Sequence, residues 1–142
     1  MAHHIAVFAE NKPGRIERVT RVLKEAGINI RAITIATSDS FGIIKLLASD
    51  PAGACNALEA AGMSVSRKEI VALLMDDRPG GLHRVLEVLG REGININDAY
   101  GFVIADKARA VLVVEVEKAQ EVEDLLRERG LATLGDEEIY AL

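Results

Sequence analysis

The strongest constraint on the fold is a pattern that the chain carries twice. The stretch ENKPGRIERVTRVLKEAGINI at residues 10–30 returns as DDRPGGLHRVLEVLGREGINI at residues 76–96, 66 positions later. Residues 13–30 and 79–96 share ten identities in eighteen aligned positions. Similarity at a fixed period indicates an internal duplication. The sequence therefore predicts two related units, residues 1–68 and 69–142.

Each copy of the pattern predicts an amphipathic helix. In the first copy the helix spans residues 14–26, with charged side chains on the face opposite the apolar one. Pro13 stands at its start and Gly27 at its end, where a missing N–H and a missing Cβ are tolerated, and Pro79 and Gly93 repeat this arrangement. The apolar face is formed by Ile16, Val19, Val22, Leu23 and Ala26.

Runs of β character flank these helices, and a second helix follows in each half. The first half contains β runs at 4–9, 28–37 and 41–49 and a second helix from Pro51 to Gly62. The second half contains β runs at 96–105 and 108–116 and a helix near 118–129. The order β-α-β-β-α-β predicts an α+β fold of two ferredoxin-like units, each an antiparallel sheet with its helices on one face.

Residues 65–76 can be assigned to two different strands, one in each unit. KEIVAL at 68–73 resembles EEIYAL at 137–142, which would close the second unit, while residues 69–77 also align with the opening residues 3–11. The segment contains no Gly, Pro or Asn that could form a turn. We predict one long strand that ends the first unit and begins the second, and that fuses the two sheets or exchanges strands between the halves. A tight turn at 66–69 would contradict this prediction.

Composition excludes several classes of protein. The 142 residues carry a net charge of −5, and no basic cluster offsets it, so we expect no nucleic-acid partner. There is one cysteine, and no apolar stretch of the ~18 residues that a membrane-spanning helix needs. We therefore expect a soluble, cytoplasmic protein without a membrane partner.

The residue types of catalytic and metal centres do not gather in the sequence. His3 and His4 are adjacent in a predicted strand and would point to opposite faces, and His83 lies on the polar side of a predicted helix. Cys55 aligns with Val122, so we expect a buried packing residue. The sequence predicts no catalytic residue, no metal site and no cofactor.

The loops ENKPG and DDRPG suggest ligand binding. Each leads into a helix mouth, by which we mean the first turn, whose N–H groups have no partner within the helix and favour an anion. Gly14, Gly80 and Gly81 would let a ligand approach the backbone closely. The alternative is plain capping of the helices by Asn11 and Asp77.

Asn29 and Asn95 add a second candidate group. Each lies between two isoleucines in INI, so the amide should face away from the helices. An amide offers donors and an acceptor, which suits the ammonium and carboxylate groups of an amino acid. The alternative is an asparagine that bonds to nearby backbone at the start of a strand.

These residues resemble the signature of ACT domains, small regulatory modules attached to aspartate kinases, prephenate-processing enzymes and the serine-pathway dehydrogenase. The resemblance covers both halves, through ENKPGRI…VLKEAGINI and DRPGGL…VLGREGINI. Family members commonly bind amino acids where the loop after the first strand of one unit meets a strand of a neighbouring unit. The ligand-binding residues that the resemblance implies are Asn11, Pro13, Gly14, Arg15, Ile16, Asn29, Ile30, Asp77, Pro79, Gly80, Gly81, Leu82, Asn95, Ile96 and Asn97.

The two copies differ at these positions. Asp77 replaces Asn11 and would repel a carboxylate or hold an ammonium group, whereas Gly81 replaces Arg15 and removes a partner for a carboxylate. Asn97 replaces Arg31 and adds an amide. We expect two inequivalent sites, or one occupied site and one structural counterpart, and the sequence leaves open which loop is occupied.

The resemblance and the lack of a catalytic constellation together predict a regulatory sensor. It would bind a free amino acid, form a homodimer and signal to an unidentified enzyme or regulator. The alternative is a subunit that needs no ligand and supports regulation or assembly of an amino-acid biosynthetic enzyme, resembling the small subunit of acetohydroxyacid synthase. A small enzyme is disfavoured, and the sequence does not identify the amino acid.

Overall fold

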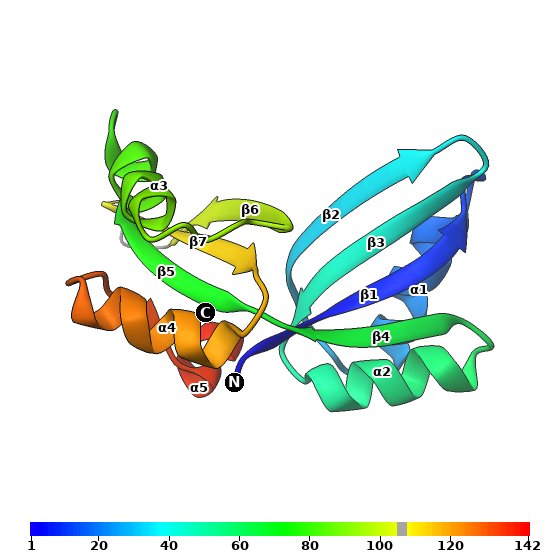
Figure 1. The fold of residues 1–142 in the computed structure, drawn as a ribbon. Helices are drawn as coiled ribbons and strands as arrows, with labels where there is room; N and C mark the ends of the chain where they lie inside the picture. Colours follow the sequence, from blue (N-terminus) through cyan, green and yellow to red (C-terminus); the bar gives the residue numbers. More distant parts are fainter. Residues whose placement is uncertain (105–107) are drawn as a thin grey trace. The chain divides into compact units, whose positions relative to one another are not determined.

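The structure is a computed structural model that describes residues 1–104 and 108–142 (Figure 1). Contacts divide it into two compact units, which we call the N-terminal unit (His3–Lys68 with Ala141) and the C-terminal unit (Met1–Ala2, Glu69–Tyr140 and Leu142). The N-terminal unit contains β1 (His3–Glu10), α1 (Arg15–Glu25), β2 (Ile30–Ser38), β3 (Phe41–Ala48), α2 (Pro51–Ala60) and β4 (Ser64–Glu69). The C-terminal unit contains β5 (Val71–Asp76), α3 (Gly81–Arg91), β6 (Asp98–Val103), β7 (Arg109–Glu115), α4 (Ala119–Glu128), β8 (Thr133–Leu134) and α5 (Asp136–Tyr140).

Each unit is built on a four-stranded sheet. The strand orders are β2-β3-β1-β4 and β6-β7-β5-β8, so the duplicated sequence gives the same topology twice. The central pairs are antiparallel, with Val7 opposite Ile44 in one sheet and Leu73 opposite Leu112 in the other. These sheets and the β-α-β-β-α-β order confirm the predicted fold class. The predicted strand at 96–105 ends at Ala105, which lies outside the described residues.

The helices of each unit pack on one face of its sheet. In the N-terminal unit, Val19 of α1 and Leu58 of α2 join one buried cluster with Ile5 and Ile44 of the sheet. The C-terminal unit has an equivalent cluster from α3, α4, β5 and β7. The apolar side chains whose spacing in the sequence predicted these helices and strands are the ones that are buried. Their burial holds each unit together. The buried members of the second cluster are Val71, Leu73, Val85, Leu89, Leu112, Val114, Val116, Ala119, Val122 and Leu126.

The segment between the units has the dual role that the sequence predicts. β4 ends at Glu69 and β5 begins at Val71, so only Ile70 separates them and no turn intervenes. β4 lies beside β1, whereas β5 is the third strand of the other sheet. The extended segment thus serves both units, but the two sheets stay separate rather than fused.

The C-terminal segment EEIYAL does not form the closing strand that its similarity to KEIVAL suggests. Strand β8 covers only Thr133–Leu134, and Asp136–Tyr140 form the short helix α5. The Gly135 N–H donates to Glu138 Oε1 at 3.2 Å, and acidic residues fill the first turn, where they favour a helix start. Ile139 of α5 is fully buried, so tertiary packing completes the helix.

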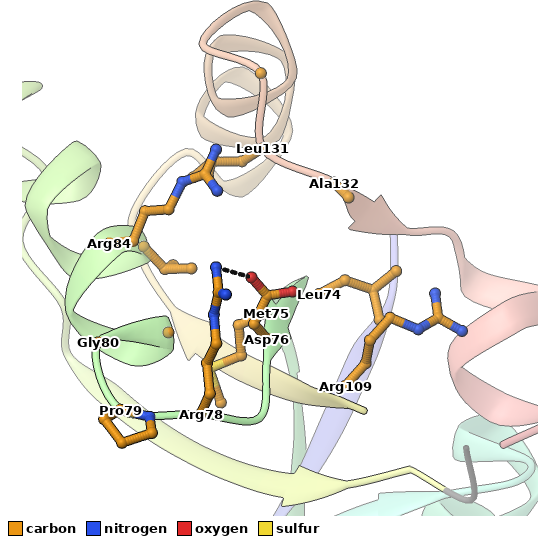
Figure 2. Close-up of a pocket in the computed structure, with 13 residues that line it drawn as sticks. Leu74, Met75, Asp76, Arg78, Pro79, Gly80, Arg84, Arg109, Leu131 and Ala132 are labelled. Carbon is orange, nitrogen blue, oxygen red and sulfur yellow. Dashed lines mark ion pairs between the residues drawn. The ribbon is translucent and has the colours of Figure 1, made fainter. Parts of the chain in front are cut away.

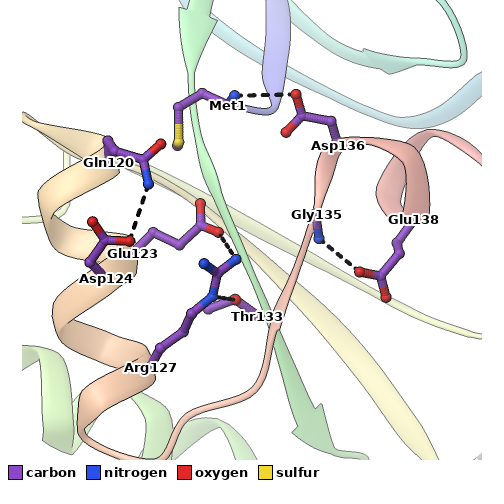
Figure 3. A network of polar contacts seen from close by, with 9 residues as sticks. All are labelled: Met1, Gln120, Glu123, Asp124, Arg127, Thr133, Gly135, Asp136 and Glu138. Carbon is purple, nitrogen blue, oxygen red and sulfur yellow. Dashed lines mark hydrogen bonds and ion pairs between the residues drawn. The ribbon is translucent and has the colours of Figure 1, made fainter.

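The first two residues belong to the C-terminal unit (Figure 3). The Met1 ammonium forms an ion pair with Asp136 at 3.2 Å, and the Met1 side chain packs against the apolar cluster of this unit. The Ile70 N–H donates to the Ala2 carbonyl at 2.9 Å. Nearby, the buried Glu123 carboxylate pairs with Arg127 (Figure 3). These contacts tie the start of the chain to the unit that the second half forms.

Cys55 is not the buried core residue that the sequence alignment suggests. The buried residues of α2 are its neighbour Ala54 and Leu58, which correspond to Val122 and Leu126 of α4. The counterpart of Val122 is therefore Ala54, one position before Cys55. Cys55 is half-buried, and its Sγ lies 3.5 Å from Glu59 Oε1. Burial and this carboxylate raise the pKa of the Cys55 thiol, which favours its protonated form.

Candidate ligand site at the mouth of α3

Neither α1 nor α3 is capped by a side chain. Both begin after a glycine in the left-handed region, Gly14 and Gly80, each with φ of 86°, and neither helix has a side-chain cap hydrogen bond. Asn11 instead donates from Nδ2 to the Asp39 carbonyl at 3.2 Å. Helix α2 differs, because Asp50 caps it by accepting from the Gly53 N–H at 3.0 Å. Capping by Asn11 and Asp77 is therefore wrong. The N–H groups of Arg15 and Gly81 donate to the Lys12 and Arg78 carbonyls, which leaves the later N–H groups of each first turn for a ligand.

The charged side chains at the mouth of α1 are paired within the N-terminal unit. Arg18 donates from Nη2 to the Ala61 carbonyl at the end of α2, at 2.7 Å. The Glu10 carboxylate lies 2.7 Å from Lys12 Nζ and 3.6 Å from Arg15 Nη2. Lys12 and, to a lesser degree, Arg15 lower the pKa of Glu10. The cations that could attract an anionic ligand are thus engaged within the N-terminal unit.

The mouth of α3 opens onto a hollow of about 460 Å³ (Figure 2). The loop after β5 and the first turn of α3 form one side, and the turn between α4 and β8 forms another. The floor is apolar and the rim carries three guanidinium groups and one carboxylate. The residues that line it are Leu74, Met75, Asp76, Arg78, Pro79, Gly80, Gly81, Arg84, Val85, Arg109, Gly130, Leu131 and Ala132.

The charges of this hollow are only partly neutralised. Arg78 Nη2 lies 3.0 Å from Asp76 Oδ2, and Figure 2 shows this pair within the hollow. Arg109 lines the hollow with its guanidinium turned away from the other two (Figure 2). Across residues 1–104 and 108–142, the Arg84 side chain has no hydrogen-bond or ion-pair partner. Arg84 corresponds to Arg18 of the first copy, so the duplicated arginine is engaged in one unit and available in the other.

Gly81 explains why the second copy lacks the arginine found at position 15. A Cβ at Gly81 would lie 2.0 Å from the Asp76 carbonyl oxygen, well inside van der Waals contact. The loop that forms the hollow therefore requires glycine at this position. Gly81 is buried there, and its N–H donates to the Arg78 carbonyl at 3.0 Å.

The asparagines occupy a different place from the helix mouths. Asn29 and Asn95 precede β2 and β6 instead of lying within them, which corrects the prediction of strand residues, although the flanking isoleucines do pack against the cores. Asn95 donates from Nδ2 to Asn97 Oδ1 at 3.1 Å, and both line a second hollow of about 570 Å³ with Glu117, Lys118 and Glu121.

These asparagines and the loops lie at opposite ends of the same helices. Helix α3 has 11 residues, so its mouth and the INI segment after it are separated by about 16 Å. A small amino acid cannot contact both within one unit. A ligand that used both segments would need them from two different units.

The predicted site residues thus separate into groups. Pro79, Gly80 and Gly81 line the hollow at α3, and Asn95 and Asn97 line the second hollow. Asp77 and Leu82 are not among the lining residues of either. The predicted residues of the first copy lie around the mouth of α1 or follow that helix, and they are Asn11, Pro13, Gly14, Arg15, Ile16, Asn29 and Ile30.

Sequence reasoning missed Arg84, Arg109 and the turn at 130–132. Arg84 carried a usable signal, since it is one of the ten identities between the copies. Within the described ranges, no three His, Cys, Asp or Glu side chains gather as metal ligands. No described helix is long and apolar enough to span a membrane.

Comparison with known proteins agrees with this architecture. Protein BT0572 from Bacteroides thetaiotaomicron, known from a crystal structure, is 32% identical, with a TM-score of 0.92 over 99% of this chain and 96% of that one. The ligand-free regulatory subunit of aspartate kinase from Thermus thermophilus shares the fold, with 16% identity and a TM-score of 0.66 over 89% and 91% of the two chains.

A curated relative matches a shorter segment. The probable acetolactate synthase small subunit of Archaeoglobus fulgidus is 44% identical over 39 residues, which are 28% of this chain. The match spans about a quarter of that relative's length, 24%. The family described as an ACT domain pair matches residues 1–142. The repeat and the two sheets define a protein of two βαββαβ units, and the chain belongs to the ACT domain pair family.

Proposed function

We propose that the protein is a regulatory sensor that binds a free amino acid at the mouth of α3 and signals to an enzyme of amino-acid metabolism without catalysis of its own. The observation that carries the proposal is the open hollow at an uncapped helix mouth, lined by arginines, in a member of a family of ACT domain pairs. An α-carboxylate is the natural partner of such a helix mouth, because free N–H groups and the helix dipole both favour an anion.

Signalling would follow from a difference in affinity between two arrangements of the protein. A ligand can shift such an equilibrium only by as much as it binds one arrangement more tightly than the other. Because the loop and the asparagines of one unit cannot reach the same small ligand, we propose that the site is completed by a second ACT unit. A homodimer would supply additional units, and an enzyme partner would respond to the shift between the two arrangements.

A thermal-shift screen of the purified protein against the twenty amino acids tests the proposal. A ligand that binds the folded state raises the melting temperature with the logarithm of its concentration above Kd. We expect such a rise with one or two amino acids. Flat curves for all twenty, with a cooperative melting transition in each, would contradict the proposal.

The second candidate function is a subunit that supports assembly of an amino-acid biosynthetic enzyme without binding a ligand. The segment similar to an acetolactate synthase small subunit favours it. In that case the melting temperature would not change when amino acids are added. The chain would form a stable complex with an enzyme subunit equally well with and without them. Size-exclusion chromatography with and without amino acids would separate the two functions.

A further inference from the structure

We infer that the hollow at the mouth of α3 selects an acidic amino acid, aspartate or glutamate, over neutral ones. The inference rests on the proposed function and names its ligand class. It starts from the charges that line the hollow, where the guanidinium groups of Arg78 and Arg84 accompany the single carboxylate of Asp76, which already pairs with Arg78. A neutral amino acid brings one ammonium and one carboxylate and leaves this excess of positive charge unmatched. An acidic amino acid adds the second carboxylate.

Three groups of the hollow can each take one group of such a ligand. The α-carboxylate accepts from N–H groups of the first turn of α3 other than that of Gly81, which donates to the Arg78 carbonyl at 3.0 Å. The ammonium group lies at the Asp76 carboxylate, which already holds Arg78 and retains further acceptor capacity. The side-chain carboxylate accepts from Arg84, whose planar guanidinium suits paired hydrogen bonds to a carboxylate.

The comparison with the first copy makes Arg84 the specificity-determining residue. Its counterpart Arg18 is committed to the Ala61 carbonyl at 2.7 Å. In the C-terminal unit, the residue that corresponds to Ala61 is Arg129, at the end of α4. The Arg129 side chain pairs with Glu92. Within the described ranges no internal acceptor takes the guanidinium of Arg84, which lines the hollow beside Gly81 and Leu131.

The size and lining of the hollow agree with a short, polar ligand. Its apolar floor is formed by Leu74, Met75, Val85, Leu131 and Ala132, which can contact the one or two methylenes of aspartate or glutamate. The rim is charged, so a long apolar side chain would meet guanidinium groups instead of a deep apolar cavity. The recognition we infer is therefore electrostatic, and binding should weaken as ionic strength rises.

Isothermal titration calorimetry of the full chain with aspartate, glutamate, asparagine and glutamine tests the inference. The two amides match the two acids in shape but lack the second charge. We expect at least one acid to bind about tenfold more tightly than its amide, and Arg84→Gln to remove most of this difference. Arg84→Lys, which keeps the charge but not the paired geometry, should retain part of it.

Arg91→Gln is the matched control. Arg91 lies in the last turn of the same helix, pairs with Glu87 at 3.2 Å and is absent from the hollow. This variant should bind like the wild type. Equal binding of acids and amides, or an acid preference that survives Arg84→Gln, would overturn the inference. Binding of only a neutral amino acid would also overturn it while leaving the proposed sensor intact. Absence of binding by all twenty amino acids would instead remove the proposed function.

Discussion

The mouths of α1 and α3 descend from one duplicated pattern but differ in what surrounds them. Both begin directly after a Pro-Gly pair whose glycine has φ of 86°, and neither is capped by a side chain. At α1, Arg18 Nη2 donates to the Ala61 carbonyl at the end of α2. At α3, the corresponding Arg84 lines an open hollow. The same residue type therefore has a structural role in one copy and is available for a ligand in the other, because its neighbours differ.

The largest expected effect concerns the residue that keeps the α3 mouth bare. Gly81→Ala would place a Cβ 2.0 Å from the Asp76 carbonyl oxygen, so the backbone must move. We expect the free energy of unfolding to fall by about 2 kcal/mol, in the range of overpacking and strain. Arg15→Ala at the equivalent, half-buried position should cost less than about 0.5 kcal/mol. Urea denaturation of both variants measures this contrast, and equal losses would break the comparison between the two loops.

The duplicated arginines should separate stability from binding. Arg18→Gln removes a partly buried hydrogen bond of a charged donor, so we expect a loss of about 1.5 kcal/mol of unfolding free energy. Arg84→Gln should change it by less than about 0.5 kcal/mol, because no described group pairs with that guanidinium. Chemical denaturation checks both values. A larger loss in Arg84→Gln than in Arg18→Gln would reverse our assignment of roles.

Capping gives a third, smaller contrast. Asp50→Ala should lower the unfolding free energy by about 1 kcal/mol, since Asp50 caps α2 through the Gly53 N–H. Asn11→Ala and Asp77→Ala should each cost less than about 0.5 kcal/mol, because neither side chain caps its helix. The melting temperatures of the three variants measure the difference. A full capping penalty at Asp77 would show that the mouth of α3 is already satisfied.

The smallest effect is a pH dependence confined to the α1 loop. Lys12 and Arg15 lower the pKa of Glu10 in the folded state. The stability that the ionised Glu10 carboxylate contributes is therefore present above the pKa that Glu10 has in the unfolded chain. It is lost as pH falls through the lowered pKa of the folded state. The stability difference between wild type and Glu10→Gln should be small at neutral pH and should disappear as pH falls through the lowered pKa of Glu10. A difference that grows on acidification would contradict this account of Glu10.

The sequence predicted most of the fold because the duplicated pattern carries strong periodic signals. Ile16 to Ala26 and their counterparts defined the first helices, Asp50 and Pro51 marked the start of α2, and the absence of a turn residue in 65–76 predicted the shared segment. The closing helix α5 was missed, since EEIYAL has the composition of a strand but packs Ile139 as part of a helix.

The candidate site was predictable only in part. Pro79, Gly80 and Gly81 were recognisable from local sequence, because the requirements of a helix mouth are local. The difference between Arg18 and Arg84 depends on residues about 45 positions away in the chain, at the ends of α2 and α4, so periodicity could not reveal it. The alignment of Cys55 was displaced by one residue because the copies differ in length before α4.

The most direct test of the central claim is residue-resolved NMR of the ¹⁵N-labelled protein during titration with the amino acid that raises its melting temperature most. Our account predicts saturable shifts of the Gly80, Gly81 and Leu82 amide signals, at the start of α3. The Gly14 and Arg15 signals at the start of α1 should stay in place. Saturable shifts at Gly14 and Arg15 with none at Gly80 and Gly81 would contradict the claim that the second copy provides the open ligand site.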